Sequence, residues 1–182
     1  MIQTKHASVL FVDDEDDILL ILEAEFKKYF EHIYLANNGN LALEIVKNHE
    51  IDLAVLDLKM PQMDGISLCR KLKEIDHDLR YVFLTAHADR PSLQAAMELG
   101  AYEVVDKPFD SNLLKLTVKT SVEKSQYEKL IKNVLKLFIQ QNTSLDFDEF
   151  NLLPFPKKEK IIHAALGVAQ LQALKIPSAK KK

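Results

Sequence analysis

The chain has 182 residues, of which 47% are hydrophobic and 28% charged, and its formal net charge is −3. This composition is typical of a soluble globular protein, and no stretch has the length of uninterrupted apolar sequence that a membrane span requires. The single cysteine, Cys69, excludes an intramolecular disulfide, and the first residues lack the apolar core of a signal peptide. We therefore expect a cytoplasmic protein without contact to a membrane.

Charge divides the chain into two parts. Residues 1–109 carry 20 acidic and 11 basic residues, a net charge of −9, whereas residues 110–182 carry 7 acidic and 13 basic residues, a net charge of +6. The acidic first part suits a cation site. The lysine-bearing second part is either a solvated helical surface or a contact for something anionic.

Short apolar runs alternate with segments of helical apolar spacing along the first two thirds of the chain. The expected strands are Ala7–Val12, His32–Ala36, Leu53–Leu56, Tyr81–Thr85 and Glu103–Val105. The expected helices run from Ile18 toward Phe30, from Leu41 to Lys47, from Gly65 to Ile75, between Asp89 and Gly100, and from Ser111 onward. This alternation predicts parallel βαβ units with right-handed crossovers, and hence an α/β fold.

The third expected strand ends at a carboxylate. Asp57 directly follows an apolar run typical of a strand that is buried on both faces, and Met60-Pro61 and Asp64-Gly65 supply turn chemistry after it. Asp57 should therefore stand at the carboxyl end of a central strand, the edge at which open α/β sheets bind ligands. The simpler interpretation is that Asp57 ends a strand and caps a turn, and the ends of the other strands decide between the two.

Polar residues follow the other expected strands as well. They are Asp13 and Asp14 after the first strand, Thr85 at the end of the fourth and Lys107 after the fifth. Together with the strings Asp57-x-x-Met60-Pro61-x-x-Asp64-Gly65 and Lys107-Pro108-Phe109, this set resembles the response-regulator receiver domain of two-component signalling. The resemblance covers about residues 5–122.

The resemblance implies a doubly wound, flavodoxin-like sheet of five parallel strands in the order 2-1-3-4-5, with the site at the switch point between strands one and three. It also implies a Mg²⁺ ion, because three carboxylates at one edge repel one another unless a hard cation keeps them ionised. By the family pattern, Asp14 and Asp57 would ligate the ion, Asp13 would act through a water, and the backbone carbonyl of Lys59 would complete the protein ligands.

The implied chemistry is phosphoryl acceptance. Asp57 would take the group from a histidine kinase, from a phosphotransfer protein or from a small acyl phosphate, and the enzymology would be limited to self-phosphorylation and self-dephosphorylation. Lys107 would pair with one phosphoryl oxygen and the hydroxyl of Thr85 would donate to another. Lys59 and His87 occupy places beside the site from which they would tune the lifetime of the phosphoryl group.

The chain departs from the family at the aromatic residue that usually completes the switch. Val104 stands at that position, and Tyr102 lies two residues earlier, on the same face of a regular strand. We therefore expect phosphorylation without the usual aromatic switch, with Tyr102 as a candidate replacement.

Residues 1–122 are predicted to form the receiver, and residues 123–182 a helical extension for dimerisation or partner docking. A helix unbroken from Ser111 to about Asn142 would be roughly 48 Å long. Its apolar set slips in phase after Val122, so its second half either faces another direction or follows a bend near Ser121–Ser125. A second helix is expected from Lys157 to Lys175, and we expect both helices to build a homodimer or to bind a downstream protein partner.

Two alternatives remain for the extension. Ala164-Ala165-Leu166-Gly167-Val168 loosely resembles the turn of a DNA-binding helix-turn-helix, which would make the chain a phosphorylation-controlled transcriptional regulator. Against DNA binding, the segment that would follow as recognition helix carries glutamines and one lysine, and no arginine follows Arg90. His163 with Gly167 four residues on suggests a phosphotransfer helix, although a lone His on an apolar helix is more often structural. The final Lys180-Lys181-Lys182 is read as a solvated end.

Overall fold

The structure is a computed structural model that describes residues 4–86 and 89–174. His87, the predicted helix end at Lys175 and the final lysines lie outside the described residues. By its internal contacts the chain divides into two compact units, residues 1–128 and residues 129–182. Within the described part, no helix is long and apolar enough to cross a membrane.

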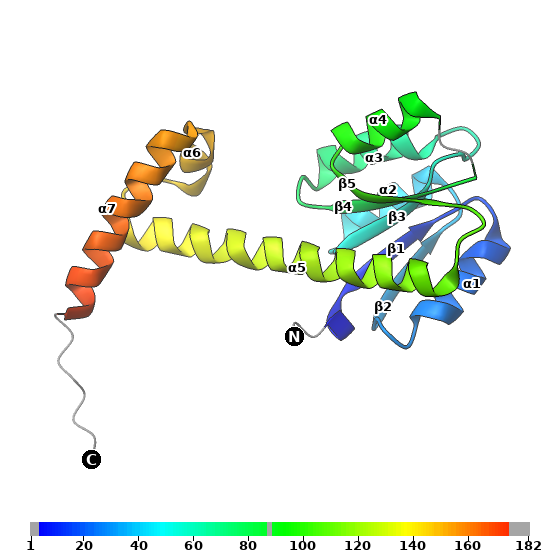
Figure 1. The fold of residues 1–182 in the computed structure, drawn as a ribbon, viewed down its shortest axis with the longest axis horizontal. Coiled ribbons are helices and arrows are strands. Elements are labelled where there is room, and N and C mark those ends of the chain that lie inside the picture. Colours follow the sequence, from blue (N-terminus) through cyan, green and yellow to red (C-terminus); the bar gives the residue numbers. More distant parts are fainter. Residues whose placement is uncertain (1–3, 87–88, 175–182) are drawn as a thin grey trace, which may run out of the picture. The chain divides into compact units, whose positions relative to one another are not determined.

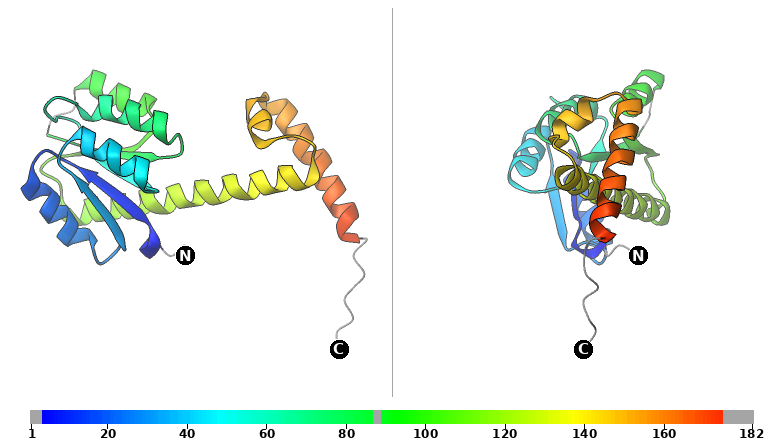
Figure 2. Two further views of the ribbon diagram at one scale, coloured as in Figure 1. Left: turned by 180° about the vertical axis from the view of Figure 1, so that it is seen from behind. Right: turned by 90° about the vertical axis from the view of Figure 1, so that its left-hand side faces the viewer.

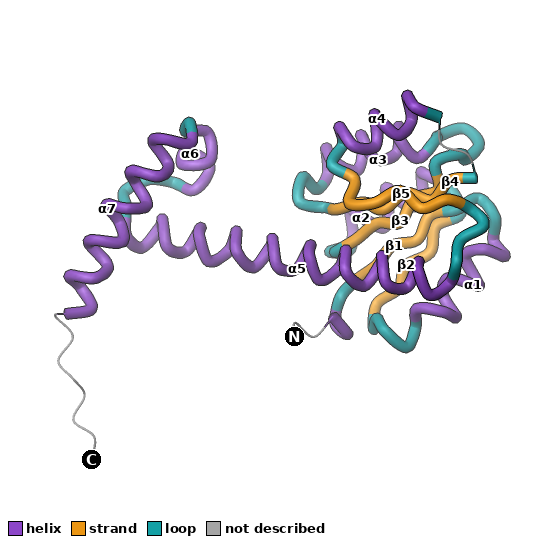
Figure 3. The backbone as a smooth tube through the Cα atoms, viewed as in Figure 1, coloured by secondary structure: helices purple, strands orange, loops and turns teal. Residues whose placement is uncertain are grey.

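The first unit is built on one five-stranded parallel sheet (Figure 1; Figure 3). Its strands are β1 (Ser8–Val12), β2 (His32–Ala36), β3 (Leu53–Asp57), β4 (Arg80–Thr85) and β5 (Ala101–Asp106). Their order in space is β2-β1-β3-β4-β5, which confirms the predicted fold class and strand order. Each predicted strand is present, and β5 is longer than predicted at both ends.

Helices cover both faces of this sheet, as Figure 1 and the reverse view in Figure 2 show. They are α1 (Asp16–Phe26), α2 (Gly39–Asn48), α3 (Gly65–Ile75), α4 (Arg90–Glu98) and the first part of α5 (Ser111–Asn142), after a short 3₁₀ turn at Thr4–His6. One apolar core joins the sheet to α2, α3 and α4, and a second joins its other face to α1 and α5. β3 is therefore buried on both faces, as the apolar run before Asp57 predicts.

Side-chain caps fix where four of these helices begin, and for α5 the cap is Asp110, which accepts from the N–H groups of Asn112 and Leu113. Asn38, Asp64 and Asp89 each accept a hydrogen bond from a backbone N–H in the first turn of the following helix, at 2.7–2.9 Å. The cap at Asp89 confirms the predicted start of α4, and Gly100, with φ of +83°, lies just after that helix. Asn38 is the cap of α2.

The prediction for Tyr102 is wrong in its geometry. Ala101 pairs with Tyr81 and Glu103 pairs with Val82, so that Tyr102 is the extra residue of a β-bulge. The bulge breaks the alternation of side chains. Val104 packs on the α2–α4 side of the sheet, whereas Tyr102 packs on the α1–α5 side. Tyr102 therefore does not share a face with Val104 and cannot stand in for an aromatic residue there.

Tyr102 instead belongs to a polar cluster between the sheet and α5. Its hydroxyl donates to Glu128 at 2.7 Å and accepts from Arg80, whose Nε also donates to Glu128 at 2.9 Å. The ammonium of Lys124 lies 4.0 Å from the centre of the Tyr102 ring. Burial raises the pKa of Tyr102 to about 12, and the hydrogen bond to Glu128 adds to that shift. This hydroxyl therefore remains a donor at neutral pH.

α5 is one unbroken helix from Ser111 to Asn142. The apolar pattern of α5 shifts after Val122 because the face that contacts the sheet continues there with small polar residues instead of apolar ones. Ser121 and Ser125 are buried, and the Ser125 hydroxyl donates to the backbone carbonyl of Asp52 at 2.7 Å. The apolar residues from Tyr127 onward lie on other faces of the helix.

The second unit contains the end of α5, α6 (Phe147–Leu152) and α7 (Phe155–Leu174). Its core is small: Ile139, Phe147 and Phe150 are buried, and the two phenylalanine rings stack at 6.3 Å. α6, which begins after the cap Asp146, was not predicted from the sequence. α7 runs without interruption through residues 164–168, so the turn that a helix-turn-helix requires there is absent, and that alternative is wrong about the local structure.

Substitution of two glycines tests how closely α3 approaches the backbone of Asp57. A Cβ at Gly65 would lie 2.3 Å from the backbone carbonyl oxygen of Asp57, whereas a Cβ at Gly167 would meet nothing within 4 Å. We expect Gly65→Ala to destabilise the first unit by about 2 kcal/mol, because a backbone atom must move. Gly167→Ala should stabilise α7 by up to ~1 kcal/mol through helix propensity. Thermal unfolding followed by circular dichroism measures both. A Gly65→Ala protein that unfolds at the parent temperature would contradict the close approach of α3 to Asp57.

Candidate functional site

The strand register brings the predicted polar residues to one edge of the sheet. Val12 is level with Leu56, Asp57 with Leu84, and Thr85 with Asp106, so the carboxyl ends of four strands are nearly in line. Backbone hydrogen bonds tie the residues after β3 and β5 to the end of β4: Leu58 N–H donates to the Leu84 carbonyl at 2.8 Å, and Lys107 N–H to the Thr85 carbonyl at 2.6 Å. The loops after β1, β3 and β5 therefore converge at the edge where ligands bind in this architecture.

Three of the predicted residues are in direct contact. The Lys107 ammonium lies 2.6 Å from Asp13 Oδ2 and 2.7 Å from Asp57 Oδ1. Asp13 is fully buried, Asp57 is 4% exposed, and the Lys107 side chain is 14% exposed. Two carboxylates are thus held close together in a desolvated place by one positive charge.

Backbone N–H groups orient the remaining carboxylate oxygens. Asp57 Oδ2 accepts from the N–H of Lys59 at 2.8 Å, and Asp13 Oδ1 accepts from the N–H of Glu15 at 3.1 Å. These bonds fix the rotamers of both acids. The peptide between Lys107 and Pro108 is cis.

Burial raises the pKa of the Asp57 carboxyl, and the negative charge of Asp13 acts in the same direction, although the ammonium of Lys107 opposes both. For Lys107, burial acts to lower the pKa, but its hydrogen bonds to Asp13 and Asp57 outweigh burial and the pKa is raised. The site therefore holds Lys107 charged and makes Asp57 more readily protonated than an ordinary aspartic acid.

Asp14, Lys59 and Thr85 complete the predicted set. Asp14 is exposed and lines an open hollow of about 500 Å³ together with Lys59. The other residues around that hollow are Leu58, Met60, Pro61, Asp64, Ile66 and Ser92. Thr85 is fully buried at the end of β4. The structure thus places Asp14 and Lys59 at the rim of the site, apart from the trio formed by Asp13, Asp57 and Lys107.

The donor chemistry of this edge fits a hard divalent cation. Asp13 and Asp57 are desolvated carboxylates that require positive charge beside them, and Asp14 and the carbonyl of Lys59 add oxygen donors at the hollow. In the described residues, however, no three acidic, histidine or cysteine side chains already converge as a metal-binding group. The Lys107 ammonium supplies the positive charge between Asp13 and Asp57 instead.

Two residues of this region, Asp64 and Ser92, were not predicted as site residues from the sequence. Asp64 caps α3, and both residues line the hollow. Asp64 lies within the string that carried the resemblance, and its place before a glycine and a helical pattern was the available signal. Ser92 comes from α4, and nothing in its spacing distinguishes it from an ordinary surface residue.

Comparison with known proteins decides the family. Residues 9–119 match the profile of the response regulator receiver domain. The chain belongs to the receiver domain family. This confirms the resemblance seen in the sequence and makes the protein a response regulator of two-component systems.

Relatives and solved structures agree with this assignment. Sporulation initiation phosphotransferase F of Bacillus subtilis is 38% identical over 111 residues, which are 61% of this chain and 90% of that protein. Regulatory protein AtoC of Escherichia coli is 30% identical over 69% of this chain, a match that spans only 27% of AtoC. A CheY-like receiver from Methanospirillum hungatei superimposes with a TM-score of 0.63 at 23% identity, over 68% of this chain and 98% of that one.

A further solved structure is the CheX-CheY-BeF3-Mg²⁺ complex from Borrelia burgdorferi. It is 30% identical, with a TM-score of 0.59, over 63% of this chain and 87% of that one.

Removal of the ammonium tests the electrostatic balance of the trio. In Mg²⁺-free buffer, Lys107→Met should destabilise the receiver by about 3 kcal/mol, because it leaves Asp13 and Asp57 buried without a counter-charge. Added Mg²⁺ should restore more stability to Lys107→Met than to the parent, since the cation then supplies the missing charge. Thermal melts with and without Mg²⁺ measure this. The control is Lys59→Met, which removes an exposed lysine at the same edge. If Mg²⁺ stabilised all three proteins equally, Lys107 would not be the counter-charge of Asp13 and Asp57.

The raised pKa of Asp57 predicts how Mg²⁺ binding depends on pH. Protons compete with the cation for the carboxylate, so the affinity should weaken on acidification, and it should start to weaken at a higher pH than for an aspartic acid of ordinary pKa. Calorimetric titration with Mg²⁺ across the acidic range measures this. In Asp57→Asn, whatever binding is left should lack this component of the pH dependence, and an unchanged profile would assign it to another group.

Proposed function

We propose that Asp57 is the phosphoacceptor of this response regulator and that it receives a phosphoryl group in the presence of Mg²⁺. The observation that carries the proposal is the position of Asp57. Its carboxylate ends the central strand, is almost fully buried, and is held beside Asp13 by Lys107. A structural aspartate that merely caps a turn has no need of a second buried acid and a lysine at hydrogen-bonding distance.

The residues of the site suit phosphoryl transfer. A carboxylate oxygen of Asp57 attacks phosphorus while the bond to the donor breaks, and the product is an acyl phosphate on Asp57. Asp14, Asp57 and the Lys59 carbonyl would hold Mg²⁺, with Asp13 acting through a water, and the bound ion would neutralise charge on the transferring group. Lys107 then exchanges its contact with Asp57 for a phosphoryl oxygen, and the Thr85 hydroxyl donates to another.

The relatives support this choice of chemistry and partner. The Bacillus subtilis relative is named as a phosphotransferase, and the Borrelia burgdorferi structure contains BeF3 and Mg²⁺. We propose a histidine kinase or phosphotransfer protein as the physiological donor. We place the protein in the cytoplasm, where its one cysteine, buried Cys69, stays reduced. We further propose that residues 1–122 act as the receiver and that residues 123–182 pass its state on, through a homodimer or a downstream protein partner.

Intact mass spectrometry tests the acceptor directly. After incubation with a small acyl phosphate and Mg²⁺, the protein should gain the mass of one phosphoryl group, and Asp57→Asn should gain none. The matched control is Asp64→Asn, which alters a carboxylate lining the same hollow but retains a residue that caps helices well. Asp64→Asn should still be phosphorylated. Equal gain by the parent and Asp57→Asn would refute the assignment of Asp57.

A further inference from the structure

α5 carries an apolar face that neither unit covers. Toward the sheet it buries Leu114, Val118 and Val122. Tyr127 follows Val118 by nine residues, which is half a turn around the helix axis at 100° per residue. Tyr127 is 55% exposed, and in the second unit Val134 on the same helix is 58% exposed, while the core of that unit uses Ile139.

The residues of this face follow a heptad spacing. Alternate steps of three and four residues connect Leu113, Leu116, Thr120, Glu123, Tyr127, Leu130, Val134 and Leu137. All of them are exposed, the leucines by 53–61%. We call this set the α5 stripe. Six of its eight members are apolar, all except Thr120 and Glu123. A solvated helix has no reason to place apolar residues at this 3.5-residue spacing, whereas packing against another helix of the same kind requires it.

We propose that the α5 stripe is the contact with a second copy of this chain, in a parallel two-stranded coiled coil. In heptad terms Tyr127 and Val134 occupy a positions, and Leu130 and Leu137 occupy d positions. Val134 is β-branched whereas Tyr127 is aromatic, and a β-branched residue at a with leucine at d favours two parallel strands. A second copy is the simplest occupant, because a two-fold axis along the stripe brings each of its residues against itself.

The size of the stripe fits this role. Six large apolar side chains with exposed fractions between 53% and 61%, joined by the neighbouring Ile131, offer roughly 700 Å² per chain, close to the ~800 Å² per partner of a standard interface. The sheet packs on the opposite side of α5, so the receiver need not be displaced when the stripe is covered.

Charges near the stripe do not oppose the contact at its receiver end. Lys119 lies 4.9 Å from the ring centre of Tyr29, and Lys124 lies 4.0 Å from that of Tyr102, so both ammonium groups are held on the receiver itself. Glu123 is the one charged member of the stripe. In a parallel pair it meets its own copy, so Glu123→Leu should tighten the dimer by about 10-fold.

Light scattering on the full chain tests the interface. The parent should be a dimer at micromolar concentration, and Leu130→Glu with Leu137→Glu should raise the dissociation constant on the order of 100-fold. Both side chains are exposed, so the variant should keep its helical circular dichroism. The control is Leu152→Glu, which alters an 87% exposed leucine outside α5 and should leave the dimer intact. A monomeric parent, or a dimer that survives the double substitution, would overturn the proposal.

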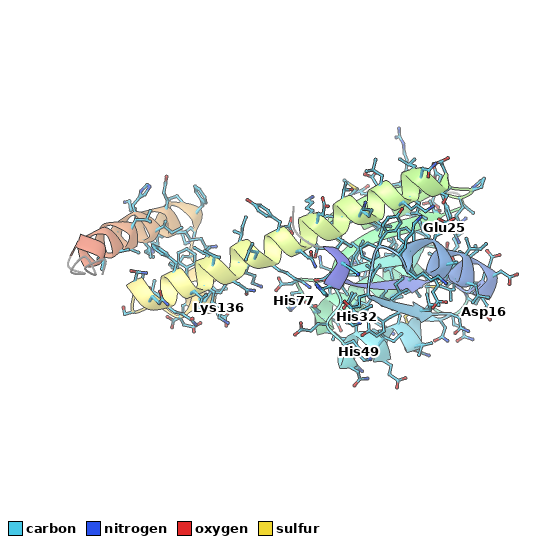
Figure 4. All side chains as sticks on the ribbon, turned by 90° about the horizontal axis from the view of Figure 1, so that it is seen from below. Asp16, Glu25, His32, His49, His77 and Lys136 are labelled. Carbon is cyan, nitrogen blue, oxygen red and sulfur yellow. The ribbon has the colours of Figure 1, made fainter. Side chains whose placement is uncertain are left out.

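Cross-linking tests the parallel orientation. In a parallel pair residue 134 faces itself, so Val134→Cys should form an intermolecular disulfide under mild oxidation, while the buried Cys69 remains unreacted. Lys136 lies on α5 (Figure 4). It is two residues after Val134, or about 200° around the helix axis, so the control Lys136→Cys should not cross-link. Dimers in which Val134→Cys fails to cross-link would overturn the parallel arrangement.

This proposal names the partner of the output that we assign to the extension, and in that respect it rests on the proposed function. A failure of the dimer can nevertheless be distinguished from a failure of Asp57 as phosphoacceptor. Light scattering needs no phosphoryl donor, and the mass of phosphorylated protein does not depend on assembly. A phosphorylated monomer would overturn the dimer alone, and a dimer that never gains phosphoryl mass would overturn the acceptor alone.

Discussion

The contact of one ammonium group with two buried carboxylates is the interaction on which the rest of the site depends. Asp13 and Asp57 lie at the ends of adjacent strands, where the sheet excludes water and their charges repel. Such an arrangement costs free energy unless positive charge is brought between them, and Lys107 brings it from the loop after β5. The stability of the edge is therefore tied to its chemistry: whatever changes the charge on Asp57 also changes what holds β5 near β1 and β3.

At the amino ends of the strands, away from the site, the sheet is held to α5 by a different kind of contact. Tyr102, Arg80 and Glu128 form a hydrogen-bonded cluster there, and the Ser125 hydroxyl binds the carbonyl of Asp52. These contacts fix the part of α5 that extends past the apolar core. β5 thus contributes to both edges, through Lys107 directly after it and through Tyr102 near its start. One strand and the residue directly after it therefore carry contacts to Asp57 at one end and to α5 at the other.

Much of the receiver could be predicted from the sequence, since its strands are apolar runs and its helix starts carry Asp or Asn caps. The site residues could be grouped for the same reason, because parallel strands place their carboxyl ends together. The face of the sheet on which Tyr102 lies could not be predicted. A bulge of one residue reverses the side-chain alternation, and β5 contains no glycine or proline to mark it. α6 was missed because six residues are too few to show helical periodicity. That the inner face of α5 continues beyond Val122 could not be predicted, because its contacts there are made by serines, which an apolar pattern does not reveal.

The bulge in β5 has a consequence for how copies of this protein meet. β5 is an outermost strand of the sheet, and such strands present unpaired backbone groups to which a strand of another molecule can bind. The bulge interrupts the regular ladder, and Glu103 and Asp106 place exposed negative charges along the strand. The β5 strands of two molecules would repel one another, and their backbone hydrogen-bonding groups would not align. Growth of the sheet from molecule to molecule is thereby disfavoured at β5, and the chain is protected there against the open-ended aggregation to which bare sheet margins are prone.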